Sequence, residues 1–150
     1  MARTILIDRG WNRIKRDTKA LQGQAVKVGF RAGPASNGVQ VVDYATFSEF
    51  GTEHIPSRPF MRRTADQAEK PIRPFASNLV AGLINGNLNV AGVMTALGTW
   101  YKDRIQTTIR TARSWATPNA PSTIKAKGSS QPLIDDGVMV ANIDYERTRL

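Results

Sequence analysis

The sequence predicts an α+β fold, in which a small antiparallel sheet packs against several helices. Val26, Val28 and Phe30 alternate with small or charged residues, which is typical of a half-buried strand. Three stretches are expected to form the sheet, near 25–31, 39–42 and 140–147. Apolar residues at helical spacing also predict a long helix near 89–113.

Two shorter helices are expected in the first third of the chain. Asp8 can cap a basic amphipathic helix that runs to about Gln22 and stops at Gly23. Asp43 can cap a second helix over 44–50. The aromatic residues of this second helix recur every three positions, so we expect them to lie in the core.

Proline and glycine punctuate the remainder of the chain. A helix is expected to begin near Pro59 and to kink or break at Pro71 and Pro74, because proline lacks the amide hydrogen that a helix interior needs. The stretch 114–131 is rich in Pro, Ser, Gly and Asn and has no apolar periodicity. It predicts an extended loop that becomes ordered on assembly.

Length and composition favour one globular domain over residues 1–150. A chain of this size buries about 68–70% of the surface that its unfolded form exposes, which is enough for one core. The sequence has no cysteine, which excludes disulfides, thiolate zinc sites and a cysteine nucleophile. The early apolar run Ile5–Ile7 is far shorter than a signal-peptide core, and we expect no sorting to a membrane.

The net charge of +9 is unevenly distributed. The last quarter of the chain is neutral, whereas basic residues gather on the first predicted helix and again after residue 57. These two basic surfaces suit either non-specific contact with DNA or contact with acidic proteins. Sequence-specific DNA recognition is not expected, because no helix-turn-helix, zinc-finger or RNP-like pattern accompanies the charge.

The stretch Glu49–Arg63 reads EFGTEHIPSRPFMRR and combines a helix stop, a stiff loop and a helix start. Gly51 suits the left-handed residue that closes a helix. Pro56 and Pro59 fix their own φ and restrict the residues before them. Such a loop either only shapes a local corner or presents a rigid surface to a partner.

Two motifs resemble those of a phage protein family. The run E-F-G-T followed by I-P-S-R-P-F-M-R is one, and a later block with Trp115, Pro118, S-T-I-K-A-K-G and P-L-I-D-D-G-V-M is the other. Their order is similar to that in tailed-bacteriophage neck and tail-completion proteins, which join the head to the tail. This resemblance covers about residues 26–145. Asp136 stands where the family usually carries Thr, and Asp135 stays available as a helix cap.

The resemblance implies a structural virion protein that forms a ring, expected to be a hexamer, around the DNA channel of the neck. It is assembled in the host cytoplasm, and its partners are copies of itself, adjoining head-connector and tail proteins, and genomic DNA. The expected subunit-interface residues are Glu49, Phe50, Gly51, Thr52, Ile55, Pro56, Arg58, Pro59, Phe60, Arg62 and Arg63. Candidates for lining the DNA channel are Arg13, Arg16 and Lys19.

Catalysis has little support in this sequence, and we expect no cofactor or metal. His54 and Ser57 could be drawn as a base and a nucleophile, but no nucleophile elbow or third orienting group accompanies them. A single histidine cannot supply a multi-histidine zinc site. The alternative to a neck protein is therefore a basic accessory protein that binds DNA without sequence preference, with a hydrolase a distant third.

Overall fold

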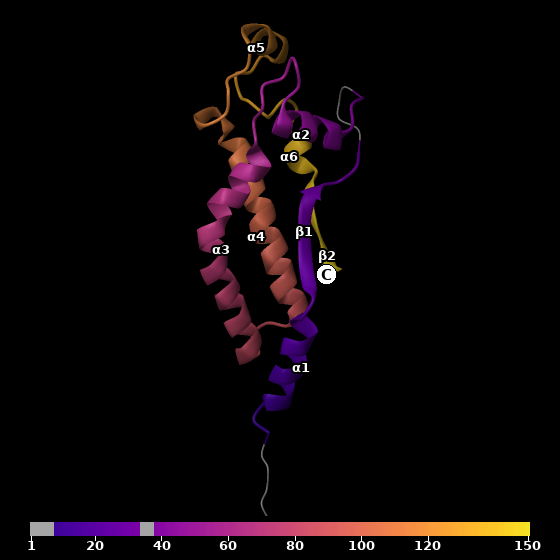
Figure 1. Cartoon of the computed structure of the whole chain (residues 1–150), viewed down its shortest axis with the longest axis vertical. Helices are drawn as coiled ribbons and strands as arrows, with labels where there is room; N and C mark the ends of the chain where they lie inside the picture. Colours follow the sequence, from indigo (N-terminus) through magenta and orange to yellow (C-terminus); the bar gives the residue numbers. More distant parts are fainter. Residues whose placement is uncertain (1–7, 34–37) are drawn as a thin grey trace, which may run out of the picture.

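The structure, a computed structural model, describes residues 8–33 and 38–150. Within them the chain is α+β, as the sequence predicts, with six α-helices, one 3-10 turn and a two-stranded sheet (Figure 1). The helices are α1 (Trp11–Leu21), α2 (Val41–Phe50), α3 (Phe60–Asn85), α4 (Val90–Arg110), α5 (Pro121–Lys127) and α6 (Val138–Ala141). The 3-10 turn is Ala112–Ser114, and the strands are β1 (Gln24–Phe30) and β2 (Ile143–Arg149).

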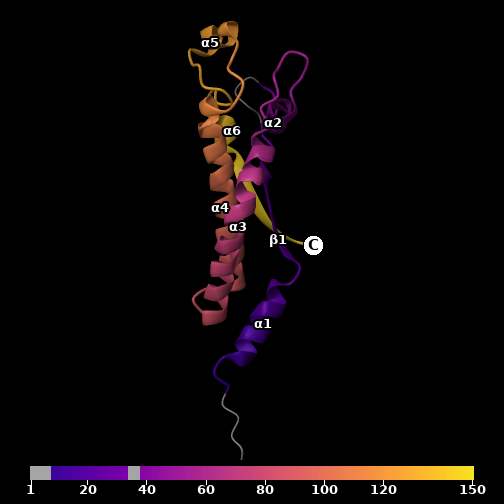
Figure 2. The same ribbon diagram turned by 60° about the vertical axis from the view of Figure 1, so that its left-hand side comes forward.

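The long axis of the molecule is set by the α3–α4 hairpin (Figures 1 and 2). The sheet lies against α4, α1 extends beyond one end of the hairpin, and α2, α5 and α6 gather at the other end. The largest buried cluster also lies toward that second end, where the aliphatic residues Ile105 and Ile109 of α4 meet Phe60 of α3 and Val41 of α2. The region that carries the candidate interface therefore sits on the best-packed part of the subunit.

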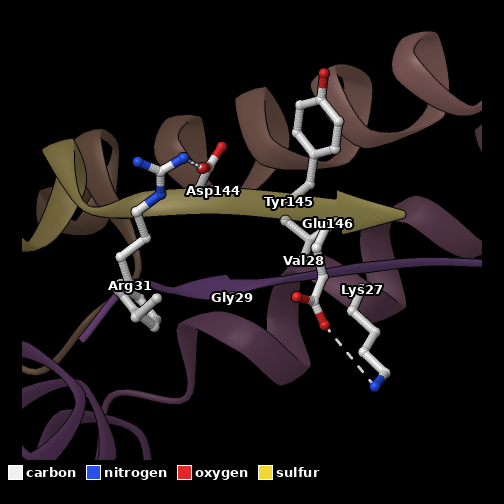
Figure 3. Close-up of a pocket in the computed structure, with 8 residues that line it drawn as sticks. Lys27, Val28, Gly29, Arg31, Asp144, Tyr145 and Glu146 are labelled. Atoms are coloured by element: carbon white, nitrogen blue, oxygen red, sulfur yellow. Dashed lines mark ion pairs between the residues drawn. The ribbon is translucent and has the colours of Figure 1, made fainter. Parts of the chain in front are cut away.

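The sheet is antiparallel, as expected, and each strand has seven residues. Its register places Val28 opposite Tyr145 and Phe30 opposite Ile143. Tyr145 projects toward the side on which α4 lies, whereas Lys27 and Glu146 point the other way and form an ion pair (Figure 3). The alternation of side chains in the sequence thus separates a packed face of the sheet from a solvent-exposed face.

The strand predicted near 39–42 is wrong. Val41 opens α2 instead, and its buried residues, Val41, Ala45, Ser48 and Glu49, recur at helical spacing. Adjacent β-branched valines favour a strand locally, but contact with the α4 core decides for a helix.

The prediction that the aromatic face of this helix lies in the core is also wrong. Phe47 and Phe50 are exposed, and Tyr44 is only partly buried. Because a helix has 3.6 residues per turn, side chains spaced three residues apart are each rotated by about 60° around the helix axis. The three rings therefore do not share one face.

The sequence predicts a kink or break at Pro71 and Pro74, but no break occurs and α3 continues through both. Each proline leaves one backbone carbonyl four residues earlier without its helical partner. These carbonyls belong to Gln67 and Lys70, which are exposed, so water can satisfy them.

The stretch 114–131 is not a plain extended loop, because it contains α5. Pro121 suits the first turn of α5, and Gly128 ends it in the left-handed conformation. The final strand starts at Ile143 rather than near 140, since 138–141 form α6. The carboxylate that accepts the backbone N–H of Val138 belongs to Asp136 and not to Asp135.

Asp8 supplies the side-chain cap that the sequence predicts for α1, although the N-cap position itself is Gly10 and the helix begins at Trp11. Its Oδ1 accepts the backbone N–H groups of Gly10 at 2.9 Å, Trp11 at 2.7 Å and Asn12 at 3.4 Å. Desolvation would raise the pKa of Asp8, but these hydrogen bonds together lower it below its ordinary value. The cap therefore contributes stability above the usual carboxyl pKa, and this contribution is lost as the pH falls through the lowered value.

Candidate subunit interface

The loop between α2 and α3 holds its shape through contacts within the subunit. Gly51 has a φ of 80°, and a Cβ added there would lie 2.9 Å from the backbone N of Ser57. Only glycine fits this approach. The loop closes on itself because Thr52 N donates to Ile55 O at 2.8 Å and Thr52 Oγ1 accepts from the backbone N–H of Ile55 at 3.1 Å.

Glu49 links the end of α2 to the start of α3. Its side chain is buried, and its two carboxylate oxygens accept the backbone N–H groups of Met61 at 2.8 Å and Arg62 at 3.2 Å. The Nε of Arg62 donates to the same carboxylate at 3.1 Å. A carboxylate at a helix N-terminus satisfies free donors and complements the helix dipole.

We expect Glu49→Gln to lower the free energy of unfolding by about 1–2 kcal/mol, because the amide loses the charge and turns an NH₂ group toward backbone donors. Urea unfolding followed by circular dichroism measures the change. The matched control is Glu53→Gln, since Glu53 is exposed on the same loop. An equal loss in both variants would contradict the capping role of Glu49.

Arg58 is buried, at 8% exposure, beneath the segment that follows the 3-10 turn. Its Nε donates to Thr117 O at 2.8 Å, and its Nη2 donates to Pro118 O at 3.2 Å and to Asn119 Oδ1 at 3.0 Å. Burial lowers the pKa of the Arg58 guanidinium below its usual value. This side chain ties the loop before α3 to a segment about sixty residues further along the chain.

The outer face of α2 carries apolar side chains that this subunit does not cover. Val42 is 41% exposed, Phe47 42% and Phe50 68%. The guanidinium carbon of Arg62 lies 5.4 Å from the centre of the Phe50 ring, a cation–π contact at the edge of this patch. A helix with apolar side chains on opposite faces normally has a covering surface on each of them. We call Val42, Phe47 and Phe50 the α2 patch.

The structure divides the eleven predicted interface residues into two groups. The residues that support the surface from beneath are Glu49, Arg58 and Phe60, which are buried, and Gly51, Ile55, Pro59 and Arg63, which are partly buried. The residues that lie exposed are Phe50, Thr52, Pro56 and Arg62. Their roles between subunits stay predictions.

Sequence reasoning missed Val42 and Phe47 as candidate interface residues. The signal was present, since α2 is apolar on faces that point in opposite directions and a helix of that kind needs two covering surfaces. The guanidinium carbon of Arg63 lies 4.9 Å from the centre of the Trp115 ring, which holds Arg63 within the subunit.

The three DNA-channel candidates differ in their surroundings on α1. Arg13 donates to Leu83 O at 2.8 Å and to Ile84 O, so it satisfies carbonyls at the end of α3. Arg16 is exposed and pairs with Asp17, while Lys19 is exposed. Arg13 therefore anchors α1 to the hairpin, and a role of any of the three toward DNA stays a prediction.

The two residues considered for catalysis make separate contacts. Ser57 Oγ donates to Glu49 O at 2.9 Å, and His54 is exposed with its backbone N–H 3.3 Å from Thr52 Oγ1. Among residues 8–33 and 38–150, no group of three or more His, Cys, Asp or Glu side chains is placed to hold a metal ion. No helix in the same residues is long and apolar enough to cross a membrane.

Comparisons with known proteins add no identification. No family model matches the chain, and searches of curated proteins and of solved structures found no match.

Proposed function

We propose that this protein is a structural subunit of the neck of a tailed phage or prophage, which forms a ring around the DNA channel and completes the tail or joins it to the head. The observation that carries the proposal is the α2 patch, held beside a stiff loop on the best-packed end of the subunit. The resemblance of the Glu49–Arg63 and Trp115–Met139 motifs to neck proteins supplies the type of assembly.

The α2 patch favours a protein partner over DNA. Exposed apolar side chains gathered beside charged ones mark protein interaction sites. Phosphate contact needs only positive charge, so phenylalanine and valine at this surface would add nothing to it. Because the patch is carried on a rigid corner, little conformational entropy is lost when it docks.

The neck assignment predicts that assembly depends on the α2 patch. We expect the double variant Phe47→Ser and Phe50→Ser to remain folded by circular dichroism but to stay a monomer under conditions in which the unchanged chain forms rings. The control is Ile84→Ser, which removes a comparably exposed apolar side chain at the far end of α3. Light scattering coupled to size-exclusion chromatography measures the mass, and rings of unchanged mass in the double variant would contradict this role.

The place of the protein in the virion is tested by electron microscopy of particles made without it. Separate accumulation of filled heads and complete tails is the expected result. Joined, infectious particles would refute the neck assignment. Strong, steeply salt-dependent binding of random duplex DNA by the free subunit would instead favour the accessory DNA-binding protein.

A further inference from the structure

An apolar groove lies beside β1, on the side where α3 runs. It encloses about 420 Å³ and is lined by residues of α1, β1, α3 and α4. The apolar side chains that define it include Val26, Val28, Ile72, Ala76, Val80 and Leu97. The β1 strand forms one wall, α3 forms the other, and α4 forms the floor.

The β1 wall of this groove has unpaired backbone groups. Arg31 N donates to Asn142 O and Leu150 N donates to Gly23 O, and both pairs follow the register of the sheet. In an antiparallel pair this pattern turns the polar groups of odd-numbered β1 residues toward β2 and those of even-numbered residues away from it. Within residues 8–33 and 38–150, no hydrogen bond to the outward backbone groups of Val26, Val28 or Phe30 is formed.

An apolar groove with an open strand edge fits an extended peptide better than it fits a helix or a small molecule. Such a peptide satisfies the free N–H and C=O groups of the edge and places alternate side chains in the apolar groove. An unprotected edge in an isolated subunit is otherwise a site of uncontrolled pairing. The occupant should therefore be a short segment rich in β-branched residues.

We propose that the run Thr4–Ile7 of a neighbouring copy of this chain docks in the groove as a strand added to β1. The sequence T-I-L-I is rich in β-branched residues, and a spacing of two lets Ile5 and Ile7 face the apolar floor together. This inference rests on the proposed ring, since it names one of the contacts that would join its subunits.

We take the donor to be another copy, because the full length of α1 separates Asp8 from Leu21, which borders the groove. Ile7 is bonded to Asp8, which precedes the first residue of α1, whereas Leu21, the last residue of α1, borders the groove. Figure 1 shows that α1 extends beyond the end of the α3–α4 hairpin. The eleven residues of α1 separate its two ends by about 16 Å. A contact between two different surfaces of identical chains closes into a ring when the rotation between neighbours fits.

Amide hydrogen exchange of the full-length chain, kept dilute, tests the proposal with an added peptide of sequence ARTILIDR. We expect the peptide to slow the exchange of Val26, Val28 and Phe30 at least tenfold and to leave Ala25, Lys27 and Gly29 unchanged, because the odd-numbered amides already bond to β2. The control is the same peptide with Ile5→Lys and Ile7→Lys. Absence of protection, or equal protection of odd and even residues, would overturn the proposal.

Disulfide trapping tests which chain supplies the docked segment. The chain has no cysteine of its own, so no other thiol competes with the introduced ones. We expect a mixture of the Ile5→Cys and Val80→Cys chains to form a mixed disulfide dimer on mild oxidation. A mixture of Ile5→Cys and Asn78→Cys should not, because Asn78 lies exposed on the opposite side of α3. Equal trapping at both positions would overturn the proposal.

The outcomes separate this inference from the proposed function. If rings form without selective trapping, the docking of Thr4–Ile7 fails and the neck ring stands. If trapping is selective but virions form without the protein, the neck assignment alone fails.

Discussion

Arg58→Ala is expected to lower the free energy of unfolding by about 3 kcal/mol, because it leaves three acceptors without their donor. The loss of stability should begin in the segment that Arg58 contacts. Asn119 also donates to Gln131 O, so release of Thr117, Pro118 and Asn119 frees the whole segment that carries α5. Urea unfolding gives the global loss, and limited proteolysis within 114–131 reports the local opening.

Two variants separate the geometry of Arg58 from its charge. Arg58→Lys keeps the charge but cannot donate to three acceptors in a fixed fork, so we expect it to recover less than half of the lost stability. Arg113→Ala removes an exposed arginine whose side chain donates to Ser130, and it should change stability by less than about 0.5 kcal/mol. If Arg58→Ala were as mild as Arg113→Ala, the segment would be held by something other than Arg58.

Gly98→Ala is expected to destabilise the protein by about 2 kcal/mol even though alanine favours helices. A Cβ on Gly98 would lie 2.3 Å from Cδ2 of Tyr145, and two more ring atoms would be within 2.7 Å. Such overpacking costs about 3 kcal/mol, while the gain in helix propensity is about 1 kcal/mol. The clash outweighs the gain in helix propensity because Tyr145 is fixed on β2 and cannot move without lifting the strand from α4.

A double-mutant cycle identifies the clash as the cause. In a Tyr145→Ala background the ring is gone, so Gly98→Ala should change sign and stabilise the protein by up to about 1 kcal/mol. Thermal unfolding of the four chains gives the coupling energy. A loss of the same size in both backgrounds would show that the strand and α4 do not meet at Gly98.

The elements predicted well from the sequence are those whose signals are local. Alternation in β1 and helical spacing after Asn89 were sufficient, and Asn89 does cap α4 by accepting the backbone N–H of Gly92 at 2.7 Å. Gly51 and the two prolines likewise specify the loop before α3, because the allowed backbone angles of glycine and proline do not depend on distant residues.

The stiff loop before α3 was predicted correctly, whereas its role as an interface stays a prediction and the orientation of its side chains was not predictable. Phe50 and Phe60 look alike in the sequence, yet one is exposed and the other fully buried. Arg58 and Arg62 look alike as well, yet only Arg58 meets a segment about sixty residues away. No local rule distinguishes them, since their environments are made by residues distant in sequence.

The sequence by itself determined the α+β class, the two strands β1 and β2, the long α4 and the stiff corner at Gly51, all from patterns that span a few residues. Only the tertiary structure decided that Val41 begins a helix, that α2 keeps an uncovered apolar face, and that β1 leaves one edge open beside α3. These outcomes depend on which surfaces reach one another after folding, and that is a property of packing between distant segments rather than of local backbone preference.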